Sequence, residues 1–217
     1  MPDRAQKIMD SFAATYGDAS RAVLVRAPGR VNIIGEHTDY NGGFVMPIAI
    51  DRDIMIACRP NDTNEVKLYS MDFDESNGFA LDALQFNNDC QWINYPQGVT
   101  QCLQEKGFAL KGFDGVVQGN VPLGGGLSSS AAFEVVSALA FKALSGFELN
   151  DTDLALLCQR AENTFVGVNC GIMDQYVSVF ARPGCAVFLD CKSVTHEDVP
   201  LGAEEARFVV CNTMVKR

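Results

Sequence analysis

A glycine- and serine-rich run places the tightest limit on what this chain can form. Residues 121–132 read Val-Pro-Leu-Gly-Gly-Gly-Leu-Ser-Ser-Ser-Ala-Ala, and an apolar helical pattern follows at once. Glycines let backbone N–H groups approach an anion closely and adopt positive φ. The first N–H groups of a helix have no intrahelical partner and lie at its positive dipole end. The run therefore predicts a phosphate-binding loop at a helix N-terminus. No lysine follows the glycines, so it is not a Walker P-loop, and a bound nucleotide needs a metal ion or other residues to neutralise its charge.

Bulk composition predicts a folded protein and argues against two classes of partner. With 217 residues, 47% of them hydrophobic, the chain can bury the core of one large domain or two small ones. The formal net charge is −10 and no basic cluster is present, which disfavours nucleic acid. No apolar run approaches the length of a membrane span, and the first 20 residues lack the pattern of a signal peptide. We expect a cytoplasmic protein that binds neither nucleic acid nor membrane.

The cysteines also fit a cytoplasmic protein. The eight cysteines include no Cys-x-x-Cys pair, and only two histidines are present, so a zinc site is not expected. Most of the cysteines lie within apolar runs. We therefore interpret them as reduced residues of the core.

The periodicity of apolar residues predicts an α+β fold, because helices and strands are mixed without strict alternation. Helices are expected near residues 8–16, 96–106, 129–144 and 152–166. Strands are expected near residues 22–27, 44–58, 66–69, 115–119, 186–189 and 207–212. The polar segment 71–90 is expected to be irregular, and His196 is expected at the surface because it lies in a charged stretch.

A polar, turn-prone loop contains Glu36, His37, Thr38 and Asp39. Carboxylates accept hydrogen bonds from neighbouring hydroxyl groups, so this loop could bind a polyol or a sugar. Taken by itself, a solvated acidic loop is the simpler interpretation.

Asp174 and Glu162 are the other candidate carboxylates. Apolar residues surround Asp174, and a buried carboxylate needs a partner, for which Arg30 is a candidate. Such a pair could act as a base with an electrostatic stabiliser, or it could equally be a structural salt bridge. Glu162 together with Ser130 could supply hard oxygen ligands to a divalent metal ion, although an isolated helical glutamate more often faces solvent.

Three motifs, in this order, carry a family resemblance. Residues 29–43 read GRVNIIGEHTDYNGG, residues 121–132 read VPLGGGLSSSAA and residues 170–175 read CGIMDQ. Together they make nearly the whole chain resemble the galactokinases of the GHMP kinase superfamily. The second motif also resembles the ATP-phosphate loop of mevalonate and homoserine kinases. The first motif, taken over residues 27–43, is typical of a much smaller group of proteins and therefore indicates the substrate.

The resemblance implies ATP-dependent phosphorylation of α-D-galactose at its C1 hydroxyl, giving galactose 1-phosphate in galactose catabolism. It implies Asp174 as the catalytic base with Arg30 beside it, and Mg²⁺ held by Ser130 and Glu162. It implies sugar contacts from Glu36, His37, Thr38, Asp39, Gly171 and Asp174. It implies ATP contacts from Gly124, Gly125, Gly126, Leu127, Ser128, Ser129 and Ser130.

The resemblance further implies that residues 1–217 are one GHMP kinase N-terminal domain, similar to the second domain of ribosomal protein S5 and ending at or inside the domain boundary. Galactokinases continue into a ferredoxin-like C-terminal domain that is absent from this sequence, so the 217 residues alone are expected to turn over poorly. A kinase for N-acetylgalactosamine or galacturonate, a non-catalytic galactose and ATP sensor, and a truncated inactive unit remain alternatives. The intact run Ser128–Ala132 favours an enzyme.

Overall fold

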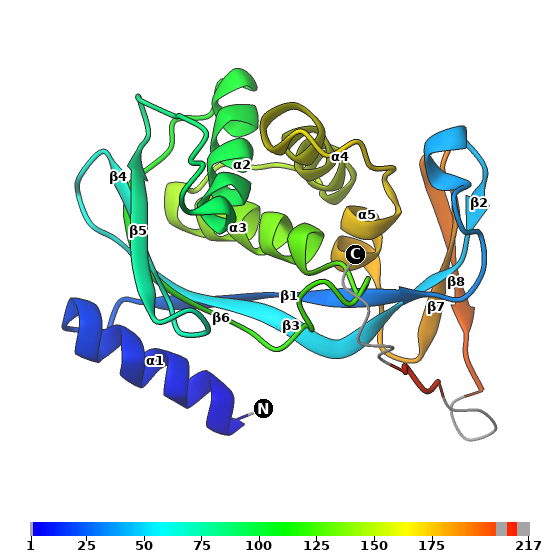
Figure 1. Cartoon of the computed structure of the whole chain (residues 1–217), viewed down its shortest axis with the longest axis horizontal. Coiled ribbons are helices and arrows are strands. Elements are labelled where there is room, and N and C mark those ends of the chain that lie inside the picture. Colours follow the sequence, from blue (N-terminus) through cyan, green and yellow to red (C-terminus); the bar gives the residue numbers. More distant parts are fainter. Residues whose placement is uncertain (1, 203–207, 212–217) are drawn as a thin grey trace.

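The computed structural model describes residues 2–202 and 208–211 of the chain. Over these residues, two β-sheets and five α-helices make up the fold (Figure 1). The helices are α1 (Pro2–Tyr16), α2 (Asn94–Glu105), α3 (Ser129–Ser145), α4 (Asp151–Ala161) and α5 (Met173–Phe180). The strands are β1 (Val23–Asn32), β2 (Phe44–Val45), β3 (Pro47–Pro60), β4 (Glu65–Ser70), β5 (Glu75–Ala80), β6 (Phe113–Gly119), β7 (Cys185–Asp190) and β8 (Thr195–Pro200).

The larger sheet has the order β1-β3-β6-β4-β5, and the smaller has the order β2-β7-β8. Among the described strands, only β4 and β6 pair in parallel, whereas the remaining pairs are antiparallel. Helices α2, α3, α4 and α5 lie on one face of the larger sheet, and α1 lies on the other (Figure 1). This arrangement is the α+β fold that the sequence predicts.

Helix α3 lies at the centre of the main core because nearly its whole circumference is apolar. Its buried residues include Val135, Ala138 and Phe141, which belong to the same cluster as Ile56 of β3 and Phe113 of β6. The helix ends where Gly146 adopts a φ of 73°, a left-handed conformation that glycine tolerates. Burial on all sides fixes α3, and with it the loop that precedes its first turn.

On the opposite face, α1 packs through a separate small cluster. Ile8 and Phe12 are fully buried against Met55, Ala57 and Val116. The expected end of this helix is confirmed, since Gly17 has a φ of 83° and its N–H donates to the carbonyl of Ala13 at 3.0 Å.

Strand β1 is longer than expected and passes through Pro28 and Gly29. Its pairing with β3 shifts register between Pro28 and Arg30, an irregularity that re-aims the side chain that follows. A Cβ on Gly29 would lie 2.7 Å from the carbonyl oxygen of Leu127, so only glycine allows the loop before α3 to approach the strand this closely.

Several expected elements differ from the structure. The segment 71–90 contains β5, an edge strand, and is therefore not wholly irregular. The helix expected at 152–166 begins at Asp151, and its last turn is a π-helix over Glu162–Val166. The strand expected at 207–212 is wrong over residues 208–211, which form no strand; residues 207 and 212 lie outside the described residues. Helix α5 and strand β8 are elements that the sequence did not predict.

His196 is a further correction, because its side chain is mostly buried and not fully exposed at the surface. It lies on β8 with its side chain only 19% exposed, and its Nδ1 is 2.9 Å from the hydroxyl of Tyr176. The ring also contacts the aromatic ring of Phe180. Packing against two aromatic side chains of α5 outweighs the polar sequence around it.

All eight cysteines are free thiols: four are buried, three are partly buried and Cys211 is exposed. The expectation that the cysteines lie in the core therefore holds in full for four of the eight. Within residues 2–202 and 208–211, no helix has the length and apolar character needed to cross a bilayer.

Candidate active site

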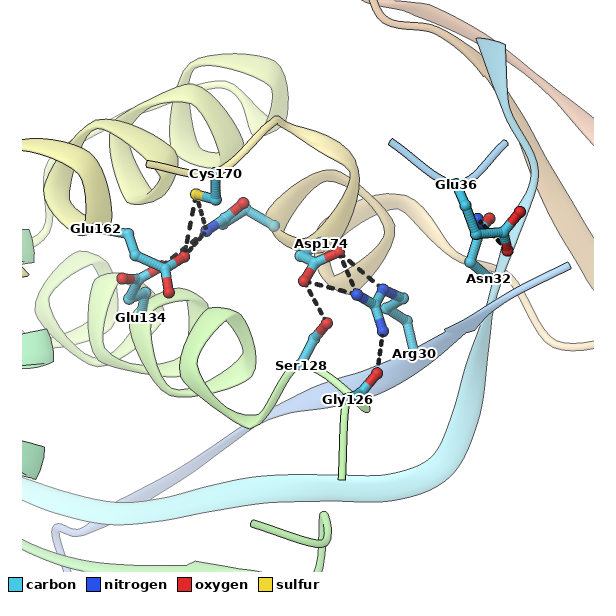
Figure 2. A network of polar contacts seen from close by, with 10 residues as sticks. Arg30, Asn32, Glu36, Gly126, Ser128, Glu134, Glu162, Cys170 and Asp174 are labelled. Atoms are coloured by element: carbon cyan, nitrogen blue, oxygen red, sulfur yellow. Dashed lines mark hydrogen bonds and ion pairs between the residues drawn. The ribbon is translucent and has the colours of Figure 1, made fainter. Parts of the chain in front are cut away.

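Arg30 and Asp174 form a two-pronged ion pair between β1 and α5 (Figure 2). The Nε and Nη2 atoms of Arg30 donate to Oδ1 and Oδ2 of Asp174, each at 2.8 Å. The side chains are 13% and 25% exposed, so the pair is largely shielded yet still reachable from solvent. A parallel pair of charge-assisted hydrogen bonds fixes the orientation of the carboxylate.

The glycine- and serine-rich loop lies against this ion pair. Nη1 of Arg30 donates to the carbonyl of Gly126 at 2.7 Å, and its backbone N–H donates to the carbonyl of Leu127 at 3.1 Å. Gly124 and Gly126 have φ values of 67° and 70°, which a residue with a side chain rarely adopts. The loop ends at Ser128, and α3 begins at Ser129, leaving the first N–H groups of the helix without intrahelical partners. The loop therefore has the geometry of an anion site.

An apolar pocket of about 450 Å³ opens beside this loop. Its wall combines Gly124, Ser129 and Ser130 with the aromatic rings of Trp92 and Tyr95. Its remaining wall residues include Ile54, Val117, Val121, Leu123 and Phe133. The flat aromatic base of a nucleotide fits a wall of this kind. The phosphates of the same nucleotide would then lie over the glycine- and serine-rich loop.

The polar loop at 36–39 reaches the same region from the other side. A Cβ added to Gly171 would lie 2.0 Å from Oδ2 of Asp39, so the carboxylate of Asp39 rests directly on the backbone just before α5. Glu36 is exposed and accepts a hydrogen bond from the amide of Asn32 at 3.1 Å. The structure thus brings Asp39 and Gly171 together, three residues from Asp174.

His37 and Thr38 are more committed to the loop itself. His37 is exposed and adopts a φ of 61°, and its Nδ1 is 2.5 Å from the hydroxyl of Tyr40. The single hydroxyl proton of Thr38 faces the carbonyls of Gly35 and Phe44, each at 2.8 Å. Thr38 therefore shapes the loop, whatever else its oxygen contacts.

Glu162 is buried, which corrects the expectation that a helical glutamate faces solvent. Its residue exposure is 5%, and it lies where α4 passes into the π-helical turn. Burial raises the pKa of Glu162, while hydrogen bonds from Cys170 and Ser130 act in the opposite direction. Ser130 and Glu162, 32 positions apart in sequence, are therefore neighbours in the structure.

A second buried carboxylate, Glu134 of α3, lies behind Glu162. It is 0% exposed, and burial raises its pKa well above the ordinary value, with the charge of Glu162 adding to the effect. The amide Nε2 of Gln175 donates to Glu134 at 3.0 Å and to Glu162 at 2.7 Å (Figure 2). Gln175 thus joins the two carboxylates to the helix that carries Asp174.

The donor set around Glu162 fits a hard divalent cation. None of the ion pairs between described residues includes Glu134 or Glu162, and Oε1 of Glu134 is buried without a hydrogen-bond partner. Such uncompensated carboxylates are favourable only when protonated or beside a cation. In the described part of the chain, no group of three or more His, Cys, Asp or Glu side chains forms a metal cage. Mg²⁺, which binds through one or two carboxylates and substrate phosphates, suits this arrangement.

Glu134, Gln175 and the contact between Ser128 and Asp174 were not anticipated from the sequence. One signal existed for Glu134, because it is the only acidic residue in the apolar helix 129–144. No comparable signal marked the others, since a serine or a glutamine next to a motif has many possible partners.

Two family models match the chain. The galactokinase galactose-binding signature matches residues 10–60, and the GHMP kinases N-terminal domain matches residues 94–182. The first match contains Arg30 and the loop at 36–39, and the second contains the glycine- and serine-rich loop, Glu162 and Asp174.

The curated proteins that the chain resembles are also galactokinases. The chain is 47% identical to a galactokinase of Roseiflexus sp. (strain RS-1) over 97% of this chain and 53% of that protein. It is 45% identical to a galactokinase of Chloroflexus aurantiacus over 89% of this chain and 49% of that protein. The chain therefore spans about half the length of the curated relatives it matches.

Among solved structures, the galactokinase of Lactococcus lactis complexed with galactose superposes with a TM-score of 0.87 at 35% identity, covering 92% of this chain and 52% of that one. A mevalonate kinase superposes with a TM-score of 0.68 at 22% identity, covering 84% of this chain and 58% of that one. The second likeness concerns the fold alone.

Proposed function

Because the chain belongs to the galactokinase family of the GHMP kinase superfamily and corresponds to the N-terminal part of its members, we propose that the protein transfers the γ-phosphoryl group of ATP to the C1 hydroxyl of α-D-galactose. The product is galactose 1-phosphate. The observation that carries the proposal is the ion pair of Arg30 and Asp174, because it lies where the loop at 36–39 and the phosphate-binding loop meet.

The donor side consists of the phosphate-binding loop and the pocket beside it. The N–H groups of residues 124–130 face the phosphates of ATP, and the apolar pocket receives the adenine base between its aromatic walls. Ser130 and Glu162 would hold Mg²⁺. When bound, the ion neutralises phosphate charge, which answers the absence of a lysine from the loop.

The acceptor side consists of Asp39, Gly171 and Asp174, with Glu36 and His37 at the rim. The carboxylates accept hydrogen bonds from sugar hydroxyls. Asp174 takes the proton of the C1 hydroxyl. At the same time the hydroxyl oxygen bonds to the γ-phosphorus, and the bond between this phosphorus and the ADP oxygen breaks. Arg30 orients the carboxylate through their two hydrogen bonds and offsets negative charge that develops during transfer.

The test uses the whole product of the gene, with MgATP and galactose. The expected result is release of ADP together with a phosphate resonance coupled to the anomeric proton of galactose. Asp174→Asn should abolish this turnover while ATP binding is retained. A protein that binds ATP and galactose without turnover is a sensor and contradicts the proposal. A higher kcat/KM for N-acetylgalactosamine or galacturonate than for galactose would reassign the substrate.

We also propose the cytoplasm as the place of this reaction, the compartment in which cysteine thiols stay reduced. All eight cysteines of the chain are free thiols. Fractionation of cells that produce the whole protein tests this location.

A further inference from the structure

Ser128 has a backbone conformation and a side-chain contact that its place before a helix does not explain. It precedes α3 with φ 61° and ψ 48°, in the left-handed region that residues other than glycine rarely adopt. A serine before a helix ordinarily accepts a hydrogen bond from an N–H group of the first turn. The side chain of Ser128 makes no such capping bond.

The hydroxyl of Ser128 instead donates to Asp174. Its Oγ lies 2.5 Å from Oδ2 of the carboxylate, the range of a charge-assisted bond between a hydroxyl and a carboxylate (Figure 2). Arg30 holds the same carboxylate through both of its oxygens. With donors from β1 and from the phosphate-binding loop, the plane of the carboxylate is fixed.

The loop is bonded to both members of the ion pair. Gly126 and Leu127 accept hydrogen bonds from Arg30, and the next residue, Ser128, donates to Asp174. A shift of residues 126–128 would therefore displace the arginine and the carboxylate together. The left-handed backbone at Ser128 is the conformation in which its hydroxyl meets Asp174 while the helix still begins at Ser129.

We propose that Ser128 is a positioning residue that couples the phosphate-binding loop to Asp174. In this role, the loop conformation that receives the phosphates also orients the carboxylate toward the acceptor hydroxyl. The inference rests on the proposed function for the reaction, but the coupling itself rests on geometry alone. Ser128 acts through Asp174 and needs no contact with the transferred phosphoryl group.

Two substitutions separate the hydroxyl from the backbone. Ser128→Ala removes the hydroxyl and keeps a side chain in the strained conformation, whereas Ser128→Gly removes the hydroxyl and the strain together. Ser137→Ala is the matched control, because Ser137 is buried in α3, the helix that follows Ser128, and its hydroxyl donates to the carbonyl of Phe133 at 2.7 Å.

The first measurement is steady-state kinetics of the whole gene product. Loss of a hydrogen bond to a charged group should lower kcat roughly 10- to 100-fold in both Ser128 variants, with KM for ATP and galactose within about twofold of the wild type. Ser137→Ala should keep the wild-type kcat. Ser128→Gly should also melt at a higher temperature than Ser128→Ala. Wild-type kcat in Ser128→Gly would overturn the proposal, since the residue would then serve only the shape of the loop.

The second measurement is independent of turnover. The Nε–Hε group of Arg30 gives its own NMR signal and reports on the hydrogen bond to Asp174 in the ligand-free protein. Both Ser128 variants should exchange this proton several-fold faster with solvent, while Ser137→Ala should not. Unchanged exchange in both Ser128 variants would overturn the coupling. Faster exchange in a protein that phosphorylates no hexose would support the coupling and reject the proposed function.

Discussion

At the scale of single residues, the site keeps its carboxylates in two different environments. Asp174 is paired with Arg30 and receives the hydroxyl of Ser128. Glu134 and Glu162 are buried, and the neutral amide of Gln175 donates a hydrogen bond to each of them. Buried carboxylates without a counter-charge favour protonation or a nearby cation. Under the proposed function, these two environments separate the proton-accepting role of Asp174 from the metal-binding role of Glu162.

Gly171→Ala should weaken the binding of the hexose and leave the affinity for the nucleotide unchanged. The new Cβ would lie 2.0 Å from Oδ2 of Asp39, so the carboxylate has to rotate away. Loss of a charged hydrogen bond to a sugar hydroxyl costs about 1.5–3 kcal/mol, which raises the Kd for galactose at least about tenfold. Isothermal titration with galactose and with MgATP measures both affinities.

Gly167→Ala is the control for this substitution. Gly167 has a φ of 84° and no atom within 4 Å of an added Cβ, so the change strains the backbone without moving Asp39. It should lower stability by about 1 kcal/mol and leave the Kd for galactose unchanged. Equal galactose affinity in Gly171→Ala and the wild type would remove Asp39 from the sugar site.

Glu134→Gln should stabilise the metal-free protein increasingly as pH rises. Burial raises the pKa of Glu134 well above its ordinary value of 4.5, so its contribution to stability is complete below that value and is lost as pH rises toward the folded-state pKa. Glutamine has the same shape and no charge. The gain over wild type should be near zero at pH 4 and grow by at most about 1.4 kcal/mol per pH unit above it.

Urea unfolding at a series of pH values, with EDTA present to remove divalent cations, measures this difference. A constant difference between the two proteins from pH 4 to pH 8 would show that Glu134 does not change its ionisation on folding. Adding Mg²⁺ should reduce the advantage of the variant, because a nearby cation stabilises the ionised carboxylates.

The sequence was informative about single residues where chemistry leaves few choices. A carboxylate among apolar neighbours needs a partner, and the sequence makes Arg30 a candidate partner for Asp174, which the ion pair confirms. The burial of Glu162 is not predictable from the sequence, because it depends on a π-helical turn, on a contact with Cys170 just beyond that turn and on a contact with Ser130 from a distant segment. The contact of Ser128 depends on one backbone conformation that its sequence does not encode visibly.

At the scale of elements, the strongest patterns were recovered and the weak ones were not. Helix α3 is long and apolar, so its position could be predicted closely. Strand β5 was missed because it lies at a sheet edge and its sequence, Glu-Ser-Asn-Gly-Phe-Ala, has little apolar alternation. Pairing with β4 determines it: a Cβ on Gly78 would lie 2.4 Å from the carbonyl oxygen of Val66. Helix α5 is eight residues long, too short for a clear period.

Phe12→Ala should destabilise the protein without altering the active site. Phe12 is fully buried between α1 and the outer face of the larger sheet, opposite the helices that carry the site (Figure 1). Truncation of a buried phenylalanine costs about 3–5 kcal/mol. Chemical denaturation should show this loss, and the Kd for MgATP below the unfolding transition should stay within about twofold, a change of roughly 0.4 kcal/mol.

Gln6→Ala on the same helix is the control, because Gln6 is exposed and donates a hydrogen bond to Asp10 of its own helix. It should change stability by less than about 0.5 kcal/mol. A large loss of MgATP affinity in folded Phe12→Ala would mean that α1 influences the site through the sheet.

At the scale of the whole molecule, the site is built where segments far apart in the sequence converge. The irregular end of β1, the loop before α3 and the N-terminus of α5 meet at Asp174 (Figure 2). The α+β fold could be predicted from element patterns and from the family resemblance, whereas this convergence required the three-dimensional arrangement. The chain nevertheless spans about half the length of its curated relatives, whose C-terminal part has no counterpart in these residues.

The 217 residues alone should therefore still bind nucleotide, but they should transfer the phosphoryl group poorly. The phosphate-binding loop, Ser130, Glu162 and the apolar pocket all lie within the described residues, so MgATP at 100 times its Kd should stabilise the chain by about 2.7 kcal/mol, or roughly 5–10 °C in Tm. Catalysis depends on alignment more steeply than binding does, and a misplacement of about 1 Å can cost roughly 100-fold in rate. Truncating a full-length relative after its matched part provides the direct comparison: the MgATP-induced shift in Tm should survive, while kcat should fall at least about 100-fold. Full kcat in the truncated relative would show that this half of the fold holds both substrates in reacting geometry by itself.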